Sequence, residues 1–329
     1  MRIAVDVMGS DKGPSVIIEG ALDAAKKQTF NLVLVGNEEI IKKELIRHRY
    51  AANNNIQIKH ASEIIEMNES PSQAIRRKKD SSMVKAVELV KNKEVDAVVS
   101  AGNTGAYMAS AAIYIRTIED IERPAIAILM PTLSGVSLLL DVGANVDCSP
   151  LNLYQFAIMG NEYSKYILKK GNPKVGLLNI GEEEHKGNEL TKKAYEELKK
   201  APINFVGNIE GRDIFNGKVD VIVCDGFIGN IILKATEGLG ENIYLKLCNE
   251  LKSSFLSKIG VLLSRGAYKN FKKSLNYAEY GGAPFLGING VCIKAHGNSS
   301  SLAIKNSILV AENFVNNHVN EHIKERLKN

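Results

Sequence analysis

Four short loops in the sequence combine glycine with asparagine, serine, threonine or aspartate, and each follows an apolar run. Glycine lets the backbone approach a bound group closely, and the polar side chains add short hydrogen-bonding groups. Where such a loop opens a helix, the unpaired N–H groups and the positive end of the helix dipole favour an anion. The loops are Ser100–Gly105, Asp141–Asn145, Asp225–Asn230 and His296–Ser300. Each alone is more typical of an ordinary turn or helix cap, but together they predict a site for phosphate or another oxyanion.

Two further groups of polar residues could contact an anion or an acidic partner. The loop Asn179–Asn188 also follows an apolar run, and its Lys186 could supply a point charge to a phosphate. The basic cluster Arg76-Arg77-Lys78-Lys79 precedes a predicted helix cap at Asp80–Ser82. Taken alone, the loop is better explained by a solvated lysine, whereas a solvated basic face explains the cluster as well as a binding role does.

Motifs for several other chemistries are absent from the sequence. It contains no GxxxxGK(S/T), and no GxGxxG follows an apolar run, which disfavours a nucleoside triphosphatase and a Rossmann dehydrogenase. There is no GxSxG or HExxH, and none of the six histidines has metal-ligand spacing to another His or Cys. Cys148, Cys224, Cys248 and Cys292 form no CxxC pair, so we expect buried free thiols in a reducing compartment and no metal.

The elements that must position these loops alternate between short apolar runs and segments with helical spacing. This alternation predicts an α/β protein with three layers (α/β/α) around a doubly wound, mostly parallel sheet. In such folds ligands bind outside the carboxyl ends of the strands, so we expect the loops to gather at one edge of the sheet. The predicted strands are Ile3–Val7, Leu32–Val35, Val95–Val99, Ile126–Met130, Val136–Leu140, Val175–Leu178, Val219–Cys224 and Val291–Lys294. The predicted helices are Val16–Lys27, Glu38–Arg47, Ser82–Lys91, Leu151–Lys169, Glu189–Lys200 and Ser301–Leu327.

Two of the predicted strands depart from the parallel pattern. Only a five-residue turn separates Ile126–Met130 from Val136–Leu140, which predicts an antiparallel hairpin within a mixed sheet. No internal repeat, low-complexity tract or Pro/Ser-rich linker divides the chain. We therefore expect residues 1–329 to form one continuous unit.

Composition and charge place the chain among ordinary globular proteins. Of the 329 residues, 45% are hydrophobic and 24% are charged, which excludes a disordered chain, a collagen and a disulfide scaffold. The net charge of +5 is too weak to indicate nucleic-acid binding. The N-terminus lacks the apolar region of a signal peptide, and polar residues interrupt the longest uncharged stretches. We expect a soluble, cytoplasmic protein.

The segment 243–275 has its own character. Apolar residues recur at spacings of three and four with lysines and arginine among them, which predicts a long basic amphipathic helix or a helix pair broken near Gly260 or Gly266. Its centre is apolar on every side, and basic flanks around an apolar tip suit an anionic membrane surface. A subunit interface is the alternative explanation of the stripe, and the two contacts can coexist. The predicted membrane-contact residues are Ile259, Val261, Leu262 and Leu263.

With these loops identified, the chain closely resembles the bacterial phosphate acyltransferases of phospholipid synthesis, the PlsX family, from end to end. The resemblance rests on the joint order and spacing of short motifs. At the N-terminus, Asp6–Asp11 departs from the DAMGGD of the family at two positions, and Ser10 replaces a glycine. The motifs are SAGNTG (Ser100–Gly105), DVGAN (Asp141–Asn145), NIG with KGN (Asn179–Gly181 and Lys186–Asn188), DGFIGN (Asp225–Asn230), GAPFLG (Gly282–Gly287) and HGNS (His296–Ser299).

The resemblance implies a fold similar to isopropylmalate dehydrogenases and phosphate acetyltransferases, and a homodimer. It implies that acyl–acyl carrier protein and inorganic phosphate are converted into acyl phosphate and free carrier protein, without a metal or an organic cofactor. Acyl phosphate would then feed a membrane acyltransferase that acylates glycerol 3-phosphate on the way to phosphatidic acid. The protein would associate peripherally with the inner face of the cell membrane through the helical protrusion at 243–275.

The chemistry of that reaction agrees with the residue types. Phosphate needs no strong base, and the leaving thiol has a pKa of about 8.5, so positioning and oxyanion stabilisation are the main demands. Lys186 and Asn230 are predicted to orient phosphate or stabilise the oxyanion, and Asp225 or His296 to shuttle a proton. The predicted substrate-binding residues are Gly102, Asn103, Thr104, Gly105, Asn145, Gly229, Gly297, Asn298 and Ser299.

The carrier protein implied by the resemblance is acidic, so basic clusters are its predicted docking surfaces. The predicted docking residues are Arg76, Arg77, Lys78, Lys79, Arg265, Lys269, Lys272 and Lys273.

Three alternative functions compete with this prediction. An NAD-dependent decarboxylating dehydrogenase of similar fold would need an aspartate metal cluster and a nucleotide site, and the sequence offers neither. A phosphate acetyltransferase acting on coenzyme A would leave the amphipathic protrusion and the basic clusters without a purpose. A non-enzymatic lipid-surface protein would leave the four polar loops unexplained.

Overall fold

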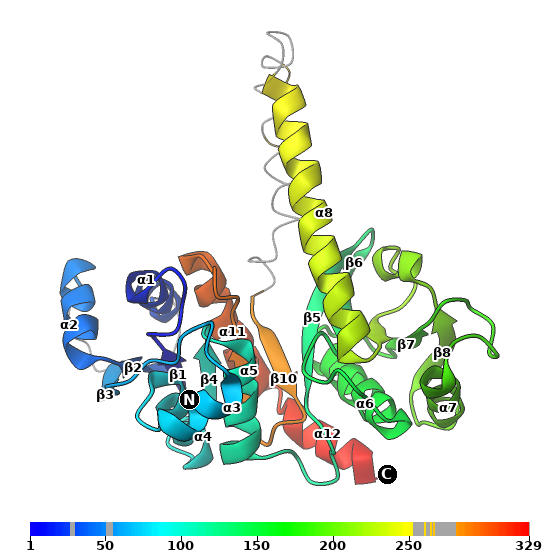
Figure 1. The fold of residues 1–329 in the computed structure, drawn as a ribbon, viewed down its shortest axis with the longest axis horizontal. Coiled ribbons are helices and arrows are strands. Elements are labelled where there is room, and N and C mark those ends of the chain that lie inside the picture. Colours follow the sequence, from blue (N-terminus) through cyan, green and yellow to red (C-terminus); the bar gives the residue numbers. More distant parts are fainter. Residues whose placement is uncertain are drawn as a thin grey trace.

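The computed structural model describes residues 1–26, 30–50, 55–252, 260, 264, 266 and 281–328. Its strands form one 11-stranded sheet in the order β3-β2-β1-β4-β11-β10-β5-β6-β9-β7-β8 (Figure 1). The strands are β1 (Arg2–Asp6), β2 (Asn31–Gly36), β3 (Ile56–His60), β4 (Ala97–Ser100), β5 (Ala125–Thr132), β6 (Gly135–Leu140), β7 (Lys174–Leu178), β8 (Asn204–Ile209), β9 (Val221–Val223), β10 (Ala283–Leu286) and β11 (Val291–Lys294).

Strand direction divides the sheet into two parallel blocks. Strands β3, β2, β1, β4 and β11 are parallel to one another, as are β6, β9, β7 and β8. Between the blocks, β11 to β10, β10 to β5 and β5 to β6 are all antiparallel steps. Three reversals leave the blocks running in opposite directions. The expectation that all polar loops leave one edge of the sheet is therefore wrong, because carboxyl ends of the two blocks lie at opposite edges.

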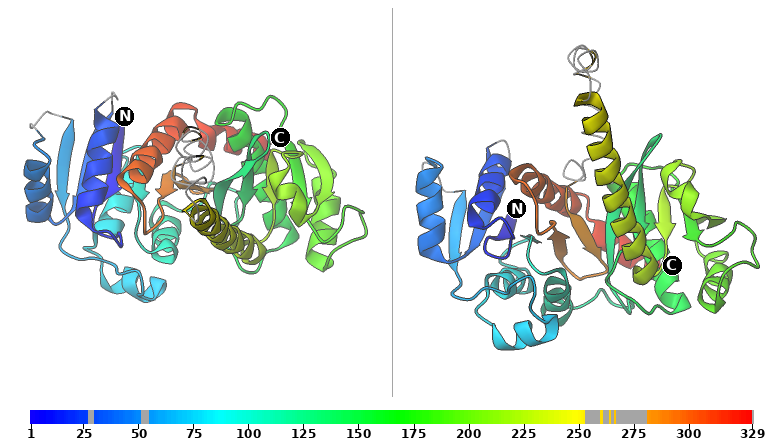
Figure 2. Two further views of the ribbon diagram at one scale, coloured as in Figure 1. Left: turned by 90° about the horizontal axis from the view of Figure 1, so that it is seen from above. Right: turned by 45° about the horizontal axis from the view of Figure 1, so that its top comes forward.

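Helices cover both faces of the sheet, as the alternating pattern predicts. They are α1 (Pro14–Ala25), α2 (Glu38–Arg47), α3 (Pro71–Arg77), α4 (Ser82–Lys91), α5 (Thr104–Ser110), α6 (Pro150–Tyr166), α7 (Glu189–Leu198), α8 (Gly226–Lys252), α11 (Ser301–Asn316) and α12 (Val319–Lys328), with a π-helical turn η1 (Ala111–Ile115) and a 3₁₀ turn η2 (Gly211–Phe215). One core packs α1, α11, α6 and α12 against the sheet, and a second core packs α4, α5 and the first turns of α8 against the opposite face. Seen from above, α11 and α8 lie on opposite sides of the sheet (Figure 2).

Helix α8 is unusual because it leaves the body of the molecule. It starts beside the sheet and extends outward well beyond the other described helices (Figure 1). The predicted helical character of the segment from residue 243 is confirmed up to Lys252, but the helix begins at Gly226 rather than at Ile243. Within the described residues, no helix has the length and apolar composition needed to cross a membrane.

Local signals explain where sequence and structure agree and where they differ. Helices α2 and α4 have the predicted bounds, and the side chains of Asn37 and Ser81 cap them. The predicted β5–β6 hairpin is confirmed, with strands long enough to leave a two-residue turn. The predicted helix Ser301–Leu327 is two helices, because His318 adopts a left-handed φ of 49° between α11 and α12.

Candidate active site

The carboxyl ends of β1, β4 and β11 hold the first group of polar residues. Asp6, Ser100 and Lys294 are paired in register across these three parallel strands. The buried Asp6 carboxylate accepts hydrogen bonds from Ser82 Oγ and Ser100 Oγ, both at 2.6 Å, and from the Met8 amide at 3.3 Å. Burial raises the pKa of Asp6 and the two hydroxyls oppose that rise. We call Asp6, Ser82, Ser100, Lys294 and the turn 295–299 the first cluster.

Close backbone contacts join three loops in the first cluster. A Cβ on Gly9 would lie 2.9 Å from Gly102 Cα, so these two loops approach each other at a distance that glycine permits. The Asp11 amide donates to Gly297 O at 3.1 Å, and Ser10 Oγ donates to the same carbonyl at 3.2 Å. The serine that departs from the family pattern therefore ties the N-terminal loop to the turn after β11.

The turn after β11 presents His296. Its Nδ1 accepts the Asn298 amide at 3.1 Å, while His296 O accepts the Ser299 amide at 3.0 Å. An Nδ1 that accepts is unprotonated, so the neutral ring carries its proton on Nε2. Burial lowers the pKa of His296, and the carboxylate of Glu237 opposes that effect. Gly297 and Ser299 are buried in this turn, whereas Asn298 is exposed.

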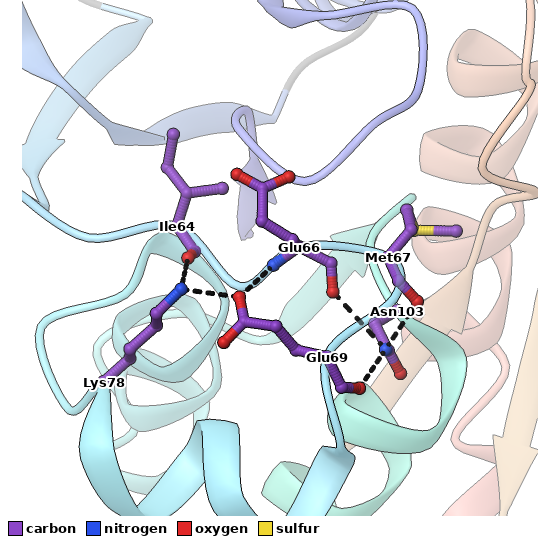
Figure 3. A network of polar contacts seen from close by, with 6 residues as sticks. All are labelled: Ile64, Glu66, Met67, Glu69, Lys78 and Asn103. Atoms are coloured by element: carbon purple, nitrogen blue, oxygen red, sulfur yellow. Dashed lines mark hydrogen bonds and ion pairs between the residues drawn. The ribbon is translucent and has the colours of Figure 1, made fainter.

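The predicted ligand residue Asn103 is engaged in holding another loop. Its Nδ2 donates to Met67 O at 2.9 Å and to Glu69 O at 3.0 Å, with a longer contact to Glu66 O at 3.5 Å (Figure 3). Its Oδ1 accepts the Ala106 amide at 3.0 Å and so caps α5. Asn103 thus acts as a clamp in this structure, and the neighbouring Thr104 and Gly105 are the exposed members of the loop.

The basic cluster at 76–79 divides between exposed and internal residues. Lys78 Nζ donates to Ile64 O at 2.7 Å and to Glu69 Oε1 at 2.5 Å, within the network that contains Asn103 (Figure 3). Arg76, Arg77 and Lys79 are exposed. A docking surface here would consist of those three side chains, with Lys78 stabilising the loop behind them.

A second group of polar residues lies at the carboxyl ends of β6 and β9. The buried Asp141 accepts hydrogen bonds from the amides of Ile126, Ala144 and Asn145 at 2.7–3.1 Å. Asn145 Nδ2 donates to Pro124 O at 2.7 Å and to Asp141 at 3.0 Å, so this predicted ligand residue stabilises its own loop.

The start of α8 packs into that loop. Gly226 N donates to Asn145 O at 2.8 Å, and Asp225 Oδ1 accepts the Ile228 amide at 2.9 Å as a helix cap. A Cβ on Gly229 would lie 1.8 Å from Asp141 O, so the helix can only pass here with glycine. Asn230 is exposed one residue later, beside Gly143.

The Lys186 loop follows the adjacent strand β7 and completes this second cluster, defined as residues 141–145, 179–188 and 225–230. Asn179 Nδ2 donates to Lys186 O at 3.2 Å, and the Lys186 amide donates to Glu183 O at 3.1 Å. Asn208 Nδ2, on β8, donates to the same Glu183 carbonyl at 2.9 Å. Sequence reasoning missed Asn208, because nothing in an edge strand marks one asparagine as a support for a distant loop.

Helix α8 starts in the second cluster, and two of its charged side chains act on the first cluster. Asn230, Lys234 and Glu237 are spaced four and three residues apart, so they share one face of the helix. Lys234 Nζ pairs with Glu237 at 2.8 Å, and both side chains act electrostatically on His296 in the first cluster. Lys234 and Glu237 therefore lie near enough to the turn after β11 to act on His296. Asn230 lies one turn nearer the start of the helix on the same face, beside Gly143 of the second cluster.

The arrangement favours positioning over covalent chemistry. Burial raises the pKa of Cys148 to about 11 and that of Cys292 to about 12, so neither is a thiolate near neutral pH. Among the described residues, no three His, Cys, Asp or Glu side chains gather as metal ligands. What the two clusters offer is a concentration of amides, hydroxyls and lysines, which suits the binding of an oxyanion.

Several predicted residues fall outside the described part of the chain. The four membrane-contact residues Ile259, Val261, Leu262 and Leu263 do so, as do the docking residues Arg265, Lys269, Lys272 and Lys273.

Comparisons with known proteins give a consistent result. Residues 1–322 match a family model described as "Fatty acid synthesis protein". A phosphate acyltransferase from a Geobacter species is 54% identical over 314 residues, which cover 95% of this chain and 89% of that relative. Two solved phosphotransacetylases are similar in fold. The one from Streptococcus pyogenes has a TM-score of 0.65 at 16% identity and covers 96% of this chain and 94% of its own. The one from Staphylococcus aureus has a TM-score of 0.62 at 14% identity, with 95% and 94% covered.

Proposed function

We propose that this chain, which belongs to the fatty acid synthesis protein family, transfers an acyl group from acyl carrier protein to inorganic phosphate. The products would be acyl phosphate and free carrier protein. The observation that carries the proposal is the pair of polar clusters, with Lys234 and Glu237 of α8 acting electrostatically on His296, in a chain whose curated relatives are phosphate acyltransferases.

The proposed reaction needs two events at the thioester carbon. A phosphate oxygen attacks the carbonyl carbon, which forms a C–O bond and places negative charge on the carbonyl oxygen. The intermediate then collapses, the C–S bond breaks, and the thiolate leaves with the electron pair and takes up a proton. Because the thiol has a pKa of about 8.5, its departure needs little assistance. Stabilising the oxyanion and aligning the phosphate are the larger contributions.

Roles for the second cluster follow from exposure and hydrogen bonding. Asn230 is exposed at the base of α8, and Lys186 is half-buried in a loop held by Asn179 and Asn208, so both could reach a bound thioester. We assign them to the oxyanion. Asp225 already caps α8, whereas His296 is neutral and has a donor at Nε2. A neutral imidazole does not give up its remaining proton to a thiolate, so we assign His296 a hydrogen bond from Nε2–H to the leaving sulfur, and the thiolate takes its proton from water.

The proposal extends to partners outside the active site. Arg76, Arg77 and Lys79 offer positive charge to an acidic carrier protein. Leu239, Ile243 and Leu245 on the outer part of α8 are 49–63% exposed. Exposed apolar side chains on a projecting helix suit a second copy of this chain or a membrane surface. Contact with the membrane would deliver acyl phosphate to the enzyme that acylates glycerol 3-phosphate.

A second candidate function is acyl transfer between coenzyme A and phosphate, which the fold similarity to phosphotransacetylases favours. It would need the same phosphate and oxyanion groups but no carrier-protein surface. Turnover of acetyl coenzyme A compared with turnover of palmitoyl carrier protein separates the two.

The decisive experiment measures release of free carrier-protein thiol from palmitoyl–acyl carrier protein, with and without inorganic phosphate. Hydroxylamine added to the same reaction traps acyl phosphate as a hydroxamate. We expect phosphate-dependent thiol release with one hydroxamate formed per thiol. Thiol release that is independent of phosphate, or that yields no hydroxamate, would refute the proposal.

A further inference from the structure

Lys294, at the end of β11, is a buried lysine for which sequence reasoning assigned no role. Only 7% of the residue is exposed. Its Nζ donates to Ala295 O, and within the part of the chain that the structure describes it makes no other hydrogen bond and no ion pair. An ammonium group has three N–H donors, so two of them lack acceptors here. A buried charge with unused donors is costly unless something binds it.

The nearby carboxylates do not accept hydrogen bonds from these two N–H donors. Asp6 and Asp11 act on Lys294 electrostatically, and burial still lowers the pKa of the ammonium to about 7. Both oxygens of Asp6 already accept hydrogen bonds from Ser82, Ser100 and the Met8 amide. Asp6 is thus satisfied as an anion without contact to Lys294, and Asp11 is exposed.

Ser299, five residues after Lys294, provides a second and independent observation. The residue is 1% exposed, and its Oγ is buried without a hydrogen-bond partner. A buried hydroxyl without a partner is rare because it has lost its hydration and gained nothing in exchange. Ser299 also lies just before α11, a helix of 16 residues whose N-terminus favours negative charge.

We propose that Lys294 and Ser299 form the binding subsite for inorganic phosphate, at the turn between β11 and α11. The unused N–H donors of the ammonium and the unpaired hydroxyl are the groups that a tetrahedral oxyanion accepts from. The inference deepens the proposed function and rests on it. It places phosphate in the first cluster, beside His296, and leaves the second cluster with Lys186 and Asn230 for the thioester.

Ser299→Ala gives the sharper test, because the hydroxyl makes no bond that the fold would lose. Without phosphate, we expect a melting temperature equal to or above that of the wild type. The affinity for inorganic phosphate, measured by calorimetry, should fall about three- to tenfold, the effect of one neutral hydrogen bond. Ser164→Ala is the matched control, since Ser164 Oγ is equally buried and unpaired but lies on α6. It should leave phosphate affinity unchanged.

Lys294→Gln tests the charge. We expect the KM for phosphate to rise about 10- to 100-fold, the effect of a charge-assisted hydrogen bond, with a much smaller change in KM for the acyl carrier protein. Lys305→Met, which removes a lysine on α11, is the control.

The possible outcomes separate the inference from the proposed function. Wild-type phosphate affinity in both Ser299→Ala and Lys294→Gln would overturn the subsite, even if the wild-type enzyme forms acyl phosphate. Phosphate binding that is lost in these variants, in a protein that forms no acyl phosphate, would support the subsite and refute the reaction. If Lys294→Gln does not fold, the calorimetry on Ser299→Ala still decides.

Discussion

The amide of Asn103 links two parts of the chain that are more than thirty residues apart, and its loss should be felt in stability before it is felt in chemistry. We expect Asn103→Ala to lower the free energy of unfolding by about 1–3 kcal/mol, because it removes the α5 cap and the hydrogen bonds to the partly buried carbonyls of Met67 and Glu69. Urea denaturation measures this. Asn103→Asp keeps the oxygen that caps α5 but loses the N–H donors. Its free energy of unfolding should therefore lie between those of the wild type and Asn103→Ala. A direct ligand role would instead give normal stability with weak substrate binding.

Lys294 should make stability depend on pH in a defined direction. Its pKa is lowered from 10.5 to about 7 on folding, mainly by burial. Between these values the unfolded chain binds one more proton than the folded chain, so the free energy of unfolding rises with pH by up to about 1.4 kcal/mol per pH unit. We expect Lys294→Gln to lack this increment between pH 7 and 9, measured without phosphate. Parallel curves for the two proteins would show that the ammonium is not desolvated.

Lys186 and Asn230 are the residues assigned to the oxyanion. Lys186→Ala and Asn230→Ala should each lower kcat by about 100-fold or more, the usual effect of losing one oxyanion donor. Because Asn230 is exposed, its variant should melt like the wild type. Near-normal turnover in both variants would remove these residues from the mechanism.

At the scale of elements, α8 offers two glycines that differ only in their surroundings. A Cβ at Gly229 would collide with the Asp141 carbonyl, whereas a Cβ at Gly238 would meet nothing within 4 Å. Gly229→Ala should destabilise the protein by about 1–3 kcal/mol or more, since backbone cannot move aside as a side chain can. Gly238→Ala should stabilise it by about 0.5–1 kcal/mol through helix propensity. Thermal unfolding of the two variants checks both signs, and equal effects would contradict the packing described here.

Sequence patterns predicted those elements whose own residues carry a signal. Helical spacing located α2 and α4, and the predicted cap at Asp80–Ser82 added a signal for α4. Strands β3 and β8 were missed because they are sheet edges with polar residues, and β10 because its four residues include Pro284, which is unusual within a strand. In these strands pairing with a neighbour, rather than local composition, determines the conformation.

The candidate site was predicted as a set of loops but not as a set of contacts. Glycine and asparagine marked loops that do follow strands. However, the side-chain amides of Asn103 and Asn145 donate to carbonyl groups of the protein itself. Lys294 was not predicted because it ends an apolar strand. Lys234 was not predicted because its electrostatic effect on His296 depends on the path of α8. Which polar groups remain available for a ligand depends on tertiary contacts that no spacing encodes.

For the whole molecule, charge should govern the encounter with the carrier protein. Arg76, Arg77 and Lys79 are exposed on one segment, and interactions between exposed charges are screened by salt. We expect the affinity for acyl carrier protein to fall steeply between low salt and about 0.5 M salt. Replacing the three residues by glutamate should raise the KM for carrier protein and leave phosphate affinity unchanged. An affinity that salt does not alter would argue against this surface.

Helix α8 also has a mechanical property that follows from its continuity. Its 27 residues form a continuous helix about 40 Å long, with Asn230 near its start and most of its length clear of the sheet (Figure 1). Near its start, the helix packs tightly against the body where Gly229 passes the Asp141 carbonyl. We therefore expect a displacement of the outer part of α8 to be felt first where the helix passes Asp141, next to Asn230.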